Sequence, residues 1–331
     1  MKKIILVFSI AFSFGLAFAQ SSSSGLPTLN QPAVVPDWFK TTFLDIQEDI
    51  EEAAEAGRTL VLFFNQEGCP YCAAMLGKNF KDERVKNIMV EKFDTIEINI
   101  WGDREVIGID GQEMIEKDFS ASLEVQFTPT MIFLDSNGKV IHRLDGFWRL
   151  EPFLELIKGI GQKGASTSAV KSKGGGAWSP IKKAATGKFD FRKTNKPIAL
   201  IIESPDCVEC PEWRKILELP KTQESLILFS LVSLNSVDDP TYLDKEGKER
   251  KVSDLMKKYD SEGYFPAMFL FSKEGQLVIH KTSLLRAFHT QSLFEYVGQG
   301  FYKEMPQFQR YINYKVERMK EEGAQEINIA Q

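Results

Sequence analysis

The sequence predicts an α/β protein of two tandem domains, because one arrangement of strand, cysteine pair and helix occurs twice. After position 58, an apolar run of the strand type leads into Gly68-Cys69-Pro70-Tyr71-Cys72, and a helical pattern follows. A second apolar run after position 197 leads into Cys207-Val208-Glu209-Cys210 and another helical pattern. A chain of 331 residues is long enough for two domains, each with its own core.

The spacing of two prolines supports this duplication. Pro129 follows Cys69 by 60 positions, Pro266 follows Cys207 by 59, and each proline precedes a predicted β-hairpin. The first cysteines of the two pairs lie 138 positions apart. This period is too long for a solenoid repeat, so it indicates a duplicated domain.

The composition is that of an ordinary globular protein, with 43% hydrophobic residues and a formal net charge of −5. No stripe or run of lysine and arginine argues for binding to nucleic acid. We therefore expect no nucleic-acid partner, and the paired cysteines carry the functional signal.

Residues 1–19 have the pattern of a signal peptide. Lys2 and Lys3 precede a short apolar run at residues 4–16, and Ala17-Phe18-Ala19 forms a cleavage pattern. The run is short for a membrane span, and a retained N-terminal anchor is the alternative. Cleavage removes two lysines and no acid, which moves the net charge from −5 to −7. No later run is long enough to cross a bilayer, and the short, bacterial style of the signal predicts a periplasmic protein.

Residues 20–36, rich in serine and proline, are expected to form a flexible leader before domain 1 at residues 37–160. This domain is predicted to begin with a helical pattern from Trp38 to near Gly57. The expected elements that follow are a strand at 59–65, the helix opened by Cys69, a helix at 85–90, a strand at 95–100, a loop insertion at 101–111, a helix at 113–122, a hairpin around Asn137-Gly138 and a closing helix at 150–160.

Residues 161–177 contain almost no large apolar side chain and predict a linker to domain 2 at residues 178–322. The expected elements of domain 2 are strands at 198–202 and 226–234, a polar insertion at 236–250, a helix at 252–259, a hairpin at 267–280, and helices at 291–301 and 306–322. His142 and His280 fall in the two return strands and are interpreted as strand-surface residues. A loose tail is expected at residues 323–331.

All four cysteines lie in the two pairs. A bridge across two intervening residues constrains little of the unfolded chain, so a working dithiol is favoured over a structural framework. The start of a helix offers unpaired N–H groups and a positive dipole end, which lower the pKa of a cysteine thiol there. The alternatives are an inert disulfide and a metal site, and a zinc site shared by both pairs would need two helix N-termini to meet. We expect no cofactor and no metal.

Together these features resemble the thioredoxin superfamily, over residues 38–160 and again over residues 178–302. The fold that this resemblance implies is a central mixed sheet flanked by helices in each domain. In the first match, Gly-Cys-Pro-Tyr-Cys and Phe-Thr-Pro-Thr are similar to periplasmic thioredoxin-like proteins of the SoxW type.

The resemblance also implies a role for each site residue. Cys69 would be the exposed attacking thiolate and Cys72 the buried resolving thiol. Pro129 matches the cis-proline that faces the dithiol, and Thr128 before it would pair with the client chain as a short added strand. An ordinary proline at the start of a strand is the alternative. The corresponding residues of domain 2 are Cys207, Cys210, Phe265 and Pro266.

The chain departs from the thioredoxin pattern near both pairs. Thioredoxins carry a buried aspartate six positions before the first cysteine, where this chain has Phe63 and Ile201. Glu67 is a candidate substitute in domain 1. Asp206 and Glu209 flank Cys207, and their negative charges should raise the pKa of that thiol and reduce its reactivity. We therefore expect the first pair to be the more reactive one.

These observations predict an exported thiol-disulfide oxidoreductase that reduces protein disulfides through Cys69 and Cys72, with domain 2 as an electron relay or a docking module. The resemblance implies client proteins with disulfides and, as electron donor, a membrane thiol transporter of the DsbD or CcdA kind. One alternative is a client-binding module with little or no redox activity. The other is a disulfide oxidase or isomerase. DsbA-like oxidants favour a histidine between the cysteines, and neither pair has one.

Overall fold

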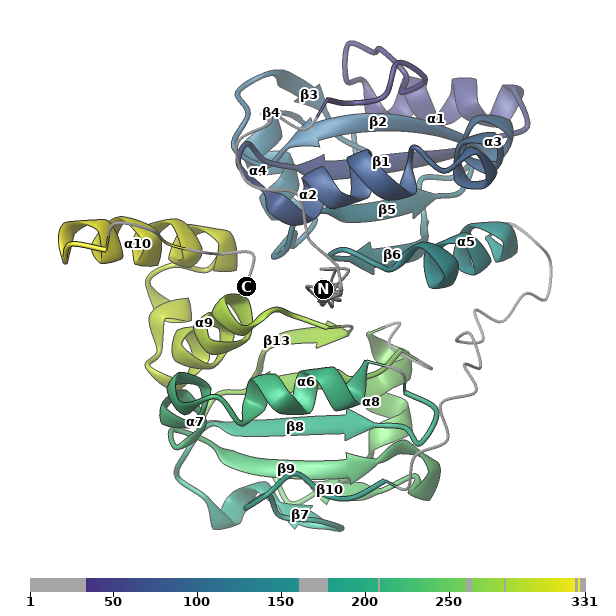
Figure 1. Ribbon diagram of the computed structural model, residues 1–331. Coiled ribbons are helices and arrows are strands. Elements are labelled where there is room, and N and C mark those ends of the chain that lie inside the picture. The colour runs from purple at the N-terminus through teal and green to yellow at the C-terminus, as the bar shows by residue number, and fades with distance from the viewer. Residues whose placement is uncertain are drawn as a thin grey trace, which may run out of the picture.

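The computed structural model describes residues 34–160, 178–207, 209–259, 264–282, 284–324 and 327. Two α/β units stack on each other, the first drawn from purple to teal and the second from green to yellow (Figure 1). The predicted signal peptide, most of the leader and the predicted linker lie outside the described residues. The predicted α/β class, with a mixed sheet and a cysteine pair in each unit, is confirmed.

The sheet of domain 1 has the order β2-β1-β5-β6. Its strands are β1 (Thr59–Asn65), β2 (Phe93–Asn99), β5 (Thr130–Leu134) and β6 (Val140–Asp145). Strand β1 runs parallel to β2 and antiparallel to β5, and β5 pairs antiparallel with β6. The start of the cysteine loop is therefore fixed to a central strand, because the loop directly follows β1.

Five α-helices and one π-helical segment cover this sheet. They are α1 (Ile46–Glu55), α2 (Pro70–Ala74), the π-helical segment Met75–Asn79, α3 (Glu83–Lys92), α4 (Glu116–Ser122) and α5 (Leu150–Gly159). Strand β1 is buried on both faces: Val61 and Phe63 face the core under α3 and α5, and Leu62 and Phe64 face the core under α1 and α4. A strand covered on both faces reads as a continuous apolar run, as this one does.

Domain 2 repeats this topology. Its main strands are β8 (Ile198–Glu203), β9 (Ser230–Asn235), β12 (Ala267–Phe271) and β13 (Leu277–Thr282), in the order β13-β12-β8-β9. Its helices are α6 (Cys210–Leu217), α7 (Pro220–Leu226), α8 (Val252–Lys258), α9 (Ala287–Gly298) and α10 (Phe308–Glu321). No helix within the described ranges is long and apolar enough to cross a membrane.

The first predicted helix is shorter than expected. It begins only at Ile46, because Asp45 caps it by accepting a hydrogen bond from the N–H of Glu48 at 3.1 Å. The segment before it contains Leu44 with a positive φ of 65°, which no helix can continue through. Phe43 is 100% exposed, so its place in the apolar pattern was misleading.

Both predicted insertions contain short strands that the sequence reading missed. Strands β3 (Glu105–Ile107) and β4 (Glu113–Ile115) form a hairpin in domain 1, so the helix predicted from residue 113 starts three residues later. In domain 2, β10 (Thr241–Leu243) pairs with β11 (Glu249–Lys251) and β7 (Phe189–Asp190). The strand predicted at 226–234 was wrong in its first four residues. Helix α7, which Pro220 opens at a first helical position, extends to Leu226, and a turn follows before β9.

Side chains of each domain pack against the other domain where the two meet. Tyr264 of domain 2 packs on Trp148 of domain 1, with ring centroids 4.6 Å apart. Phe127 of domain 1 joins the main core of domain 2 and lies 5.5 Å from the ring of Phe308, at the start of α10. Gln126 fixes the same place, since its side-chain oxygen accepts from the N–H of Phe308 at 2.8 Å. The edge strands β6 and β13 face each other across this contact (Figure 1).

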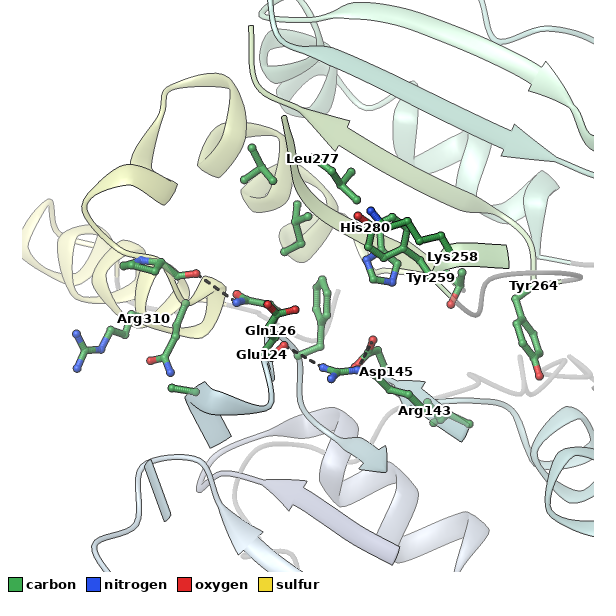
Figure 2. A pocket seen from close by; sticks show the side chains of 18 of the residues that line it. Glu124, Gln126, Arg143, Asp145, Lys258, Tyr259, Tyr264, Leu277, His280 and Arg310 are labelled. Atoms are coloured by element: carbon green, nitrogen blue, oxygen red, sulfur yellow. Dashed lines mark hydrogen bonds and ion pairs between the residues drawn. The ribbon is translucent and has the colours of Figure 1, made fainter. Parts of the chain in front are cut away.

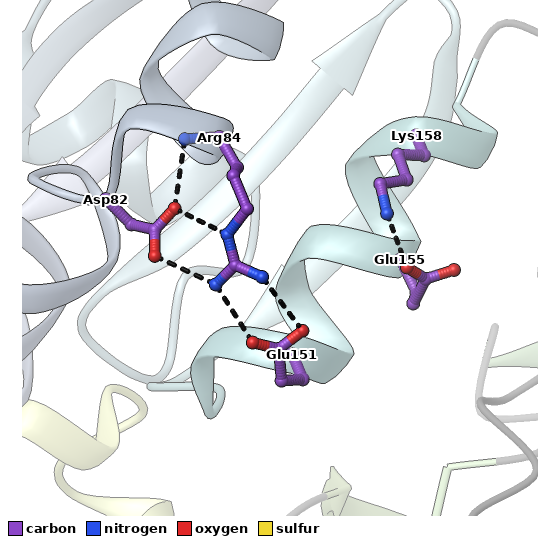
Figure 3. Close-up of polar contacts among 5 residues, drawn as sticks. All are labelled: Asp82, Arg84, Glu151, Glu155 and Lys158. Carbon is purple, nitrogen blue, oxygen red and sulfur yellow. Dashed lines mark hydrogen bonds and ion pairs between the residues drawn. The ribbon is translucent and has the colours of Figure 1, made fainter.

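Ion pairs on the outer surface of domain 1 are exposed. Arg84 joins Asp82 at the start of α3 to Glu151 at the start of α5, with N–O distances of 2.9 Å to each carboxylate (Figure 3). Lys158 pairs with Glu155 one turn further along α5, at 2.6 Å. Exposed pairs of this kind contribute little, about 0–1 kcal/mol each.

Candidate functional site

The first cysteine pair forms a disulfide at the start of a helix. Gly68, with φ of 70°, makes the turn after β1, and Cys69 is the N-cap residue of α2. The N–H of Cys72 donates to Cys69 Sγ at 3.0 Å, and Pro70 occupies the first helical position, where no donor is needed. This N–H has no acceptor within the helix, and its hydrogen bond to Cys69 Sγ will stabilise the sulfur as a thiolate after reduction.

The residues that the resemblance implied for domain 1 come together in space. The peptide bond between Thr128 and Pro129 is cis. Cys69 Sγ lies 3.5 Å from the carbonyl oxygen of Thr128, although the two residues are 59 positions apart. A polar backbone group thus borders the Cys69 sulfur.

Cys69 is not exposed as predicted. Cys69 is 6% exposed, and it lies with Cys72 and Tyr71 in a small buried cluster against which Phe147 packs. A cavity of about 160 Å³ adjoins the disulfide, and both domains line it. The physical reason is therefore the contact between the domains, which covers the groove that a lone domain 1 would leave open.

Tyr71, between the two cysteines, ties the first site to domain 2. The N–H of Arg286 donates to the Tyr71 hydroxyl oxygen at 3.3 Å, and Nδ1 of His289 lies 3.5 Å from the same oxygen. The Tyr71 and His289 rings meet edge to face at 5.1 Å. Burial raises the pKa of Tyr71 far above its ordinary value, so the hydroxyl stays protonated.

The second pair has the same local geometry. Cys207 and Cys210 form a disulfide, and the N–H of Cys210 donates to Cys207 Sγ at 3.0 Å. Cys210 opens α6 and is buried, whereas Cys207 is half-buried. The peptide bond between Phe265 and Pro266 is cis, as in domain 1.

Glu209 does not stand as an isolated negative charge beside Cys207. Its carboxylate lies 3.3 Å from Nε of Arg149 and accepts from the N–H of Leu284 at 2.9 Å. The expected rise in the pKa of Cys207 is therefore opposed by a cation from domain 1. Tyr71 and Glu209 hold the same place in their cysteine loops, and each contacts the arginine that precedes the closing helix of the other domain.

The buried aspartate that thioredoxins use as a proton acceptor is replaced by Phe63 in domain 1. Phe63 is fully buried against Phe39 and Phe80, with ring centroids 5.7 and 5.5 Å away. Glu67, the candidate substitute, is exposed, so it does not serve as a buried acceptor. Sequence reasoning also missed Lys281, a buried ammonium group in the wall of the first site.

A larger cavity of about 790 Å³ lies between the domains (Figure 2). Arg143 and Asp145 on β6 line one side, and His280 on β13 and Tyr259 line the other. Arg143 donates to Asp145 at 3.1 Å and to the carbonyl oxygens of Leu123 and Glu124, so the cation is already bound within domain 1. Among the described residues, no group of three histidine, cysteine or acidic side chains could hold a metal ion.

His142 is 5% exposed, contrary to the prediction of a strand-surface residue, and burial lowers its pKa to about 4. The unfolded chain binds a proton at this residue near pH ~6.5. The contribution of neutral His142 to the free energy of unfolding is therefore fully present above pH ~6.5. It is lost as the pH falls toward 4, by on the order of 3 kcal/mol. Burial also lowers the pKa of His280 to about 4, so urea unfolding at pH 7.5 and 4.5 measures both losses together. His142→Phe should remove the part that belongs to His142. A variant with the same pH dependence as the parent protein would refute this assignment.

One known family model matches part of domain 1. Residues 46–160 match the family model of a thioredoxin-like domain. No curated protein matches this chain. A thioredoxin-fold protein from Helicobacter pylori is 24% identical over 36% of this chain and 81% of its own, with a TM-score of 0.29. A thioredoxin from Thermus thermophilus is 22% identical over 34% of this chain and 82% of its own, with a TM-score of 0.28.

Proposed function

We propose, from the thioredoxin-like domain at residues 46–160, that this chain is an exported thiol-disulfide oxidoreductase that reduces protein disulfides. The observation that carries the proposal is the disulfide Cys69–Cys72 at a helix start, with Cys69 Sγ 3.5 Å from the backbone of Thr128 before a cis-proline. This arrangement supplies a stabilised thiolate beside backbone groups that can hold a client segment.

The proposed reaction begins from the reduced pair. The Cys69 thiolate attacks one sulfur of a client disulfide, which forms a mixed disulfide and releases the other client sulfur as a thiolate. The Cys72 thiol then loses its proton and attacks Cys69 Sγ. This step closes the disulfide seen here and releases the second client thiol. Two electrons have then passed from the protein to the client.

Electrons must return to Cys69 and Cys72 for a second cycle. In an oxidising compartment such as the periplasm, a membrane thiol transporter of the DsbD or CcdA kind is the proposed donor. Domain 2 is proposed either to relay these electrons through Cys207 and Cys210 or to dock a partner. The common local geometry of the two pairs supports the relay.

A second candidate function is a client-binding module with little redox activity. The burial of Cys69, a residue that is 6% exposed, favours it, because burial restricts the access of a folded client to the attacking sulfur. A disulfide oxidase or isomerase has less support, since neither pair contains the histidine found in DsbA-like oxidants.

Reduction of insulin by dithiothreitol tests the proposal, because cleavage of the interchain disulfides precipitates the B chain and gives a turbidity signal. The full-length chain should shorten the lag at micromolar concentration. The variant Cys207→Ser/Cys210→Ser should retain this activity, since domain 1 carries the attacking sulfur. Binding of reduced, carboxymethylated lactalbumin without any insulin reduction would support the client-binding module instead.

A further inference from the structure

Lys281 lies on β13 of domain 2, and its side chain crosses to domain 1. The residue is 2% exposed. Its Nζ donates to the carbonyl oxygen of Asp145 at 2.8 Å and also to that of Thr282. It lies 5.4 Å from the centre of the Phe127 ring, within reach of a cation–π interaction. Burial of an ammonium group costs several kcal/mol unless it gains such contacts.

The backbone that Lys281 contacts lies next to the cis-proline of the first site. Asp145 is followed by Gly146, whose N–H donates to the carbonyl oxygen of the cis-proline Pro129 at 2.7 Å. A Cβ atom on Gly146 would lie 3.2 Å from Nζ of Lys281, so the ammonium packs against this backbone. Lys281 and Gly146 both line the cavity of about 160 Å³ beside Cys69. The charge is therefore held in the wall of the first site.

Domain 1 supplies no cation to this cavity. Its described lining residues comprise Gln66, Glu67 and apolar or uncharged side chains, without lysine, arginine or histidine. Domain 2 contributes Lys281 and His289, and in addition Glu317. Lys281 is thus the one lysine or arginine among the described residues of the wall.

The charged groups around Lys281 define its protonation. Burial lowers its pKa to about 8, and the carboxylates of Asp145 and Glu209 oppose that shift. Arg143 lies beside Asp145 at 3.1 Å and Arg149 beside Glu209 at 3.3 Å, so each carboxylate is shared with another cation. At neutral pH the Lys281 ammonium keeps its proton and its positive charge.

We propose that Lys281 is a positioning residue of the first dithiol, whose ammonium group stabilises the thiolate of Cys69 across the domain boundary. The proposal deepens the proposed function and rests on it, because a stable thiolate matters only to a pair that exchanges disulfides. It makes the first site a composite of both domains. It also explains why a buried ammonium group lies in this wall, since the cysteine loop itself contains no cation that could stabilise the Cys69 thiolate.

Loss of the charge should raise the pKa of the Cys69 thiol. A cation near a thiolate typically shifts the pKa by about one unit or more. At a pH below both pKa values, one unit corresponds to about tenfold less thiolate and about tenfold slower alkylation.

The test uses full-length chains in which Cys69 is the single cysteine, made by Cys72→Ser, Cys207→Ser and Cys210→Ser. The rate of alkylation by iodoacetamide is measured from pH 4 to 10, which gives the pKa of Cys69 without any turnover. Lys281→Met should raise this pKa by about one unit. Lys281→Gln should do the same, although its amide can still donate to the Asp145 carbonyl. Lys281→Arg should keep the low value.

The matched control is Lys273→Met, since the Lys273 side chain is 62% exposed and should leave the pKa unchanged. A folded Lys281→Met or Lys281→Gln chain with the parent pKa would overturn the proposal. So would a Cys69 pKa at or above that of a free thiol, about 8.5, in the chain that keeps Lys281. If the Cys69 pKa depends on Lys281 but the parent chain with all four cysteines reduces no insulin, the proposed function is contradicted and this inference is retained.

Discussion

Cys69→Ser is expected to reduce the rate of insulin reduction to the uncatalysed rate of the dithiol in solution. The substitution removes the sulfur that attacks, and a serine hydroxyl is not nucleophilic enough to replace a thiolate at neutral pH. The fold should survive, because serine is close in size and can still accept from the N–H of Cys72. Turbidity kinetics with equal amounts of each variant measure the effect.

Cys72→Ser is the companion variant, since it leaves the attacking sulfur and removes the resolving one. It should accumulate a mixed disulfide between Cys69 and the client, visible by non-reducing electrophoresis. Cys207→Ser/Cys210→Ser serves as the control that changes two cysteines and spares the first site. Full activity in Cys69→Ser together with loss in this control would assign the reaction to domain 2.

Glu203→Gln is expected to destabilise domain 2 by about 3 kcal/mol. Glu203 ends β8 with its side chain 1% exposed, and it accepts from Arg214 of α6 at 2.8 and 2.6 Å. The neutral amide leaves Arg214 with a partly buried, uncompensated charge. Because α6 begins at Cys210, the pair also fixes the helix that carries the second disulfide. Urea unfolding followed by circular dichroism measures the change.

Glu155→Gln is the matched control for this substitution. Glu155 and Lys158 form a pair of similar length, 2.6 Å, but their side chains are 53% and 47% exposed (Figure 3). Its loss should change the stability by less than about 0.5 kcal/mol. Equal losses in both variants would show that burial does not determine the strength of the Glu203–Arg214 pair.

The repeated local pattern made much of the fold predictable. The strands β1, β8 and β12 are short apolar runs bounded by turns. Helix α2 begins directly after Cys69, and α6 begins at Cys210. Errors arose where one residue type suits two structures. Residues 226–229 are apolar like a strand, yet they belong to the end of α7 and the turn after it.

The candidate site was predictable only within each domain. Cys69, Thr128 and Pro129 could be grouped because a family pattern relates them along one domain. The contacts of Tyr71 with Arg286 and of Lys281 with Asp145 join residues 215 and 136 positions apart in different domains. No periodicity or motif encodes such contacts, because they depend on how two folded surfaces meet. The burial of Cys69 follows from the same packing and was missed for the same reason.

The reduction potential of the first dithiol tests the central claim most directly. It is measured in Cys207→Ser/Cys210→Ser by equilibration with glutathione buffers, followed by alkylation and mass analysis of the peptide that contains Cys69 and Cys72. The account predicts a value near that of thioredoxin, about −270 mV, which suits a reductase. A value near that of DsbA, about −120 mV, would contradict it, since such a pair would oxidise its clients.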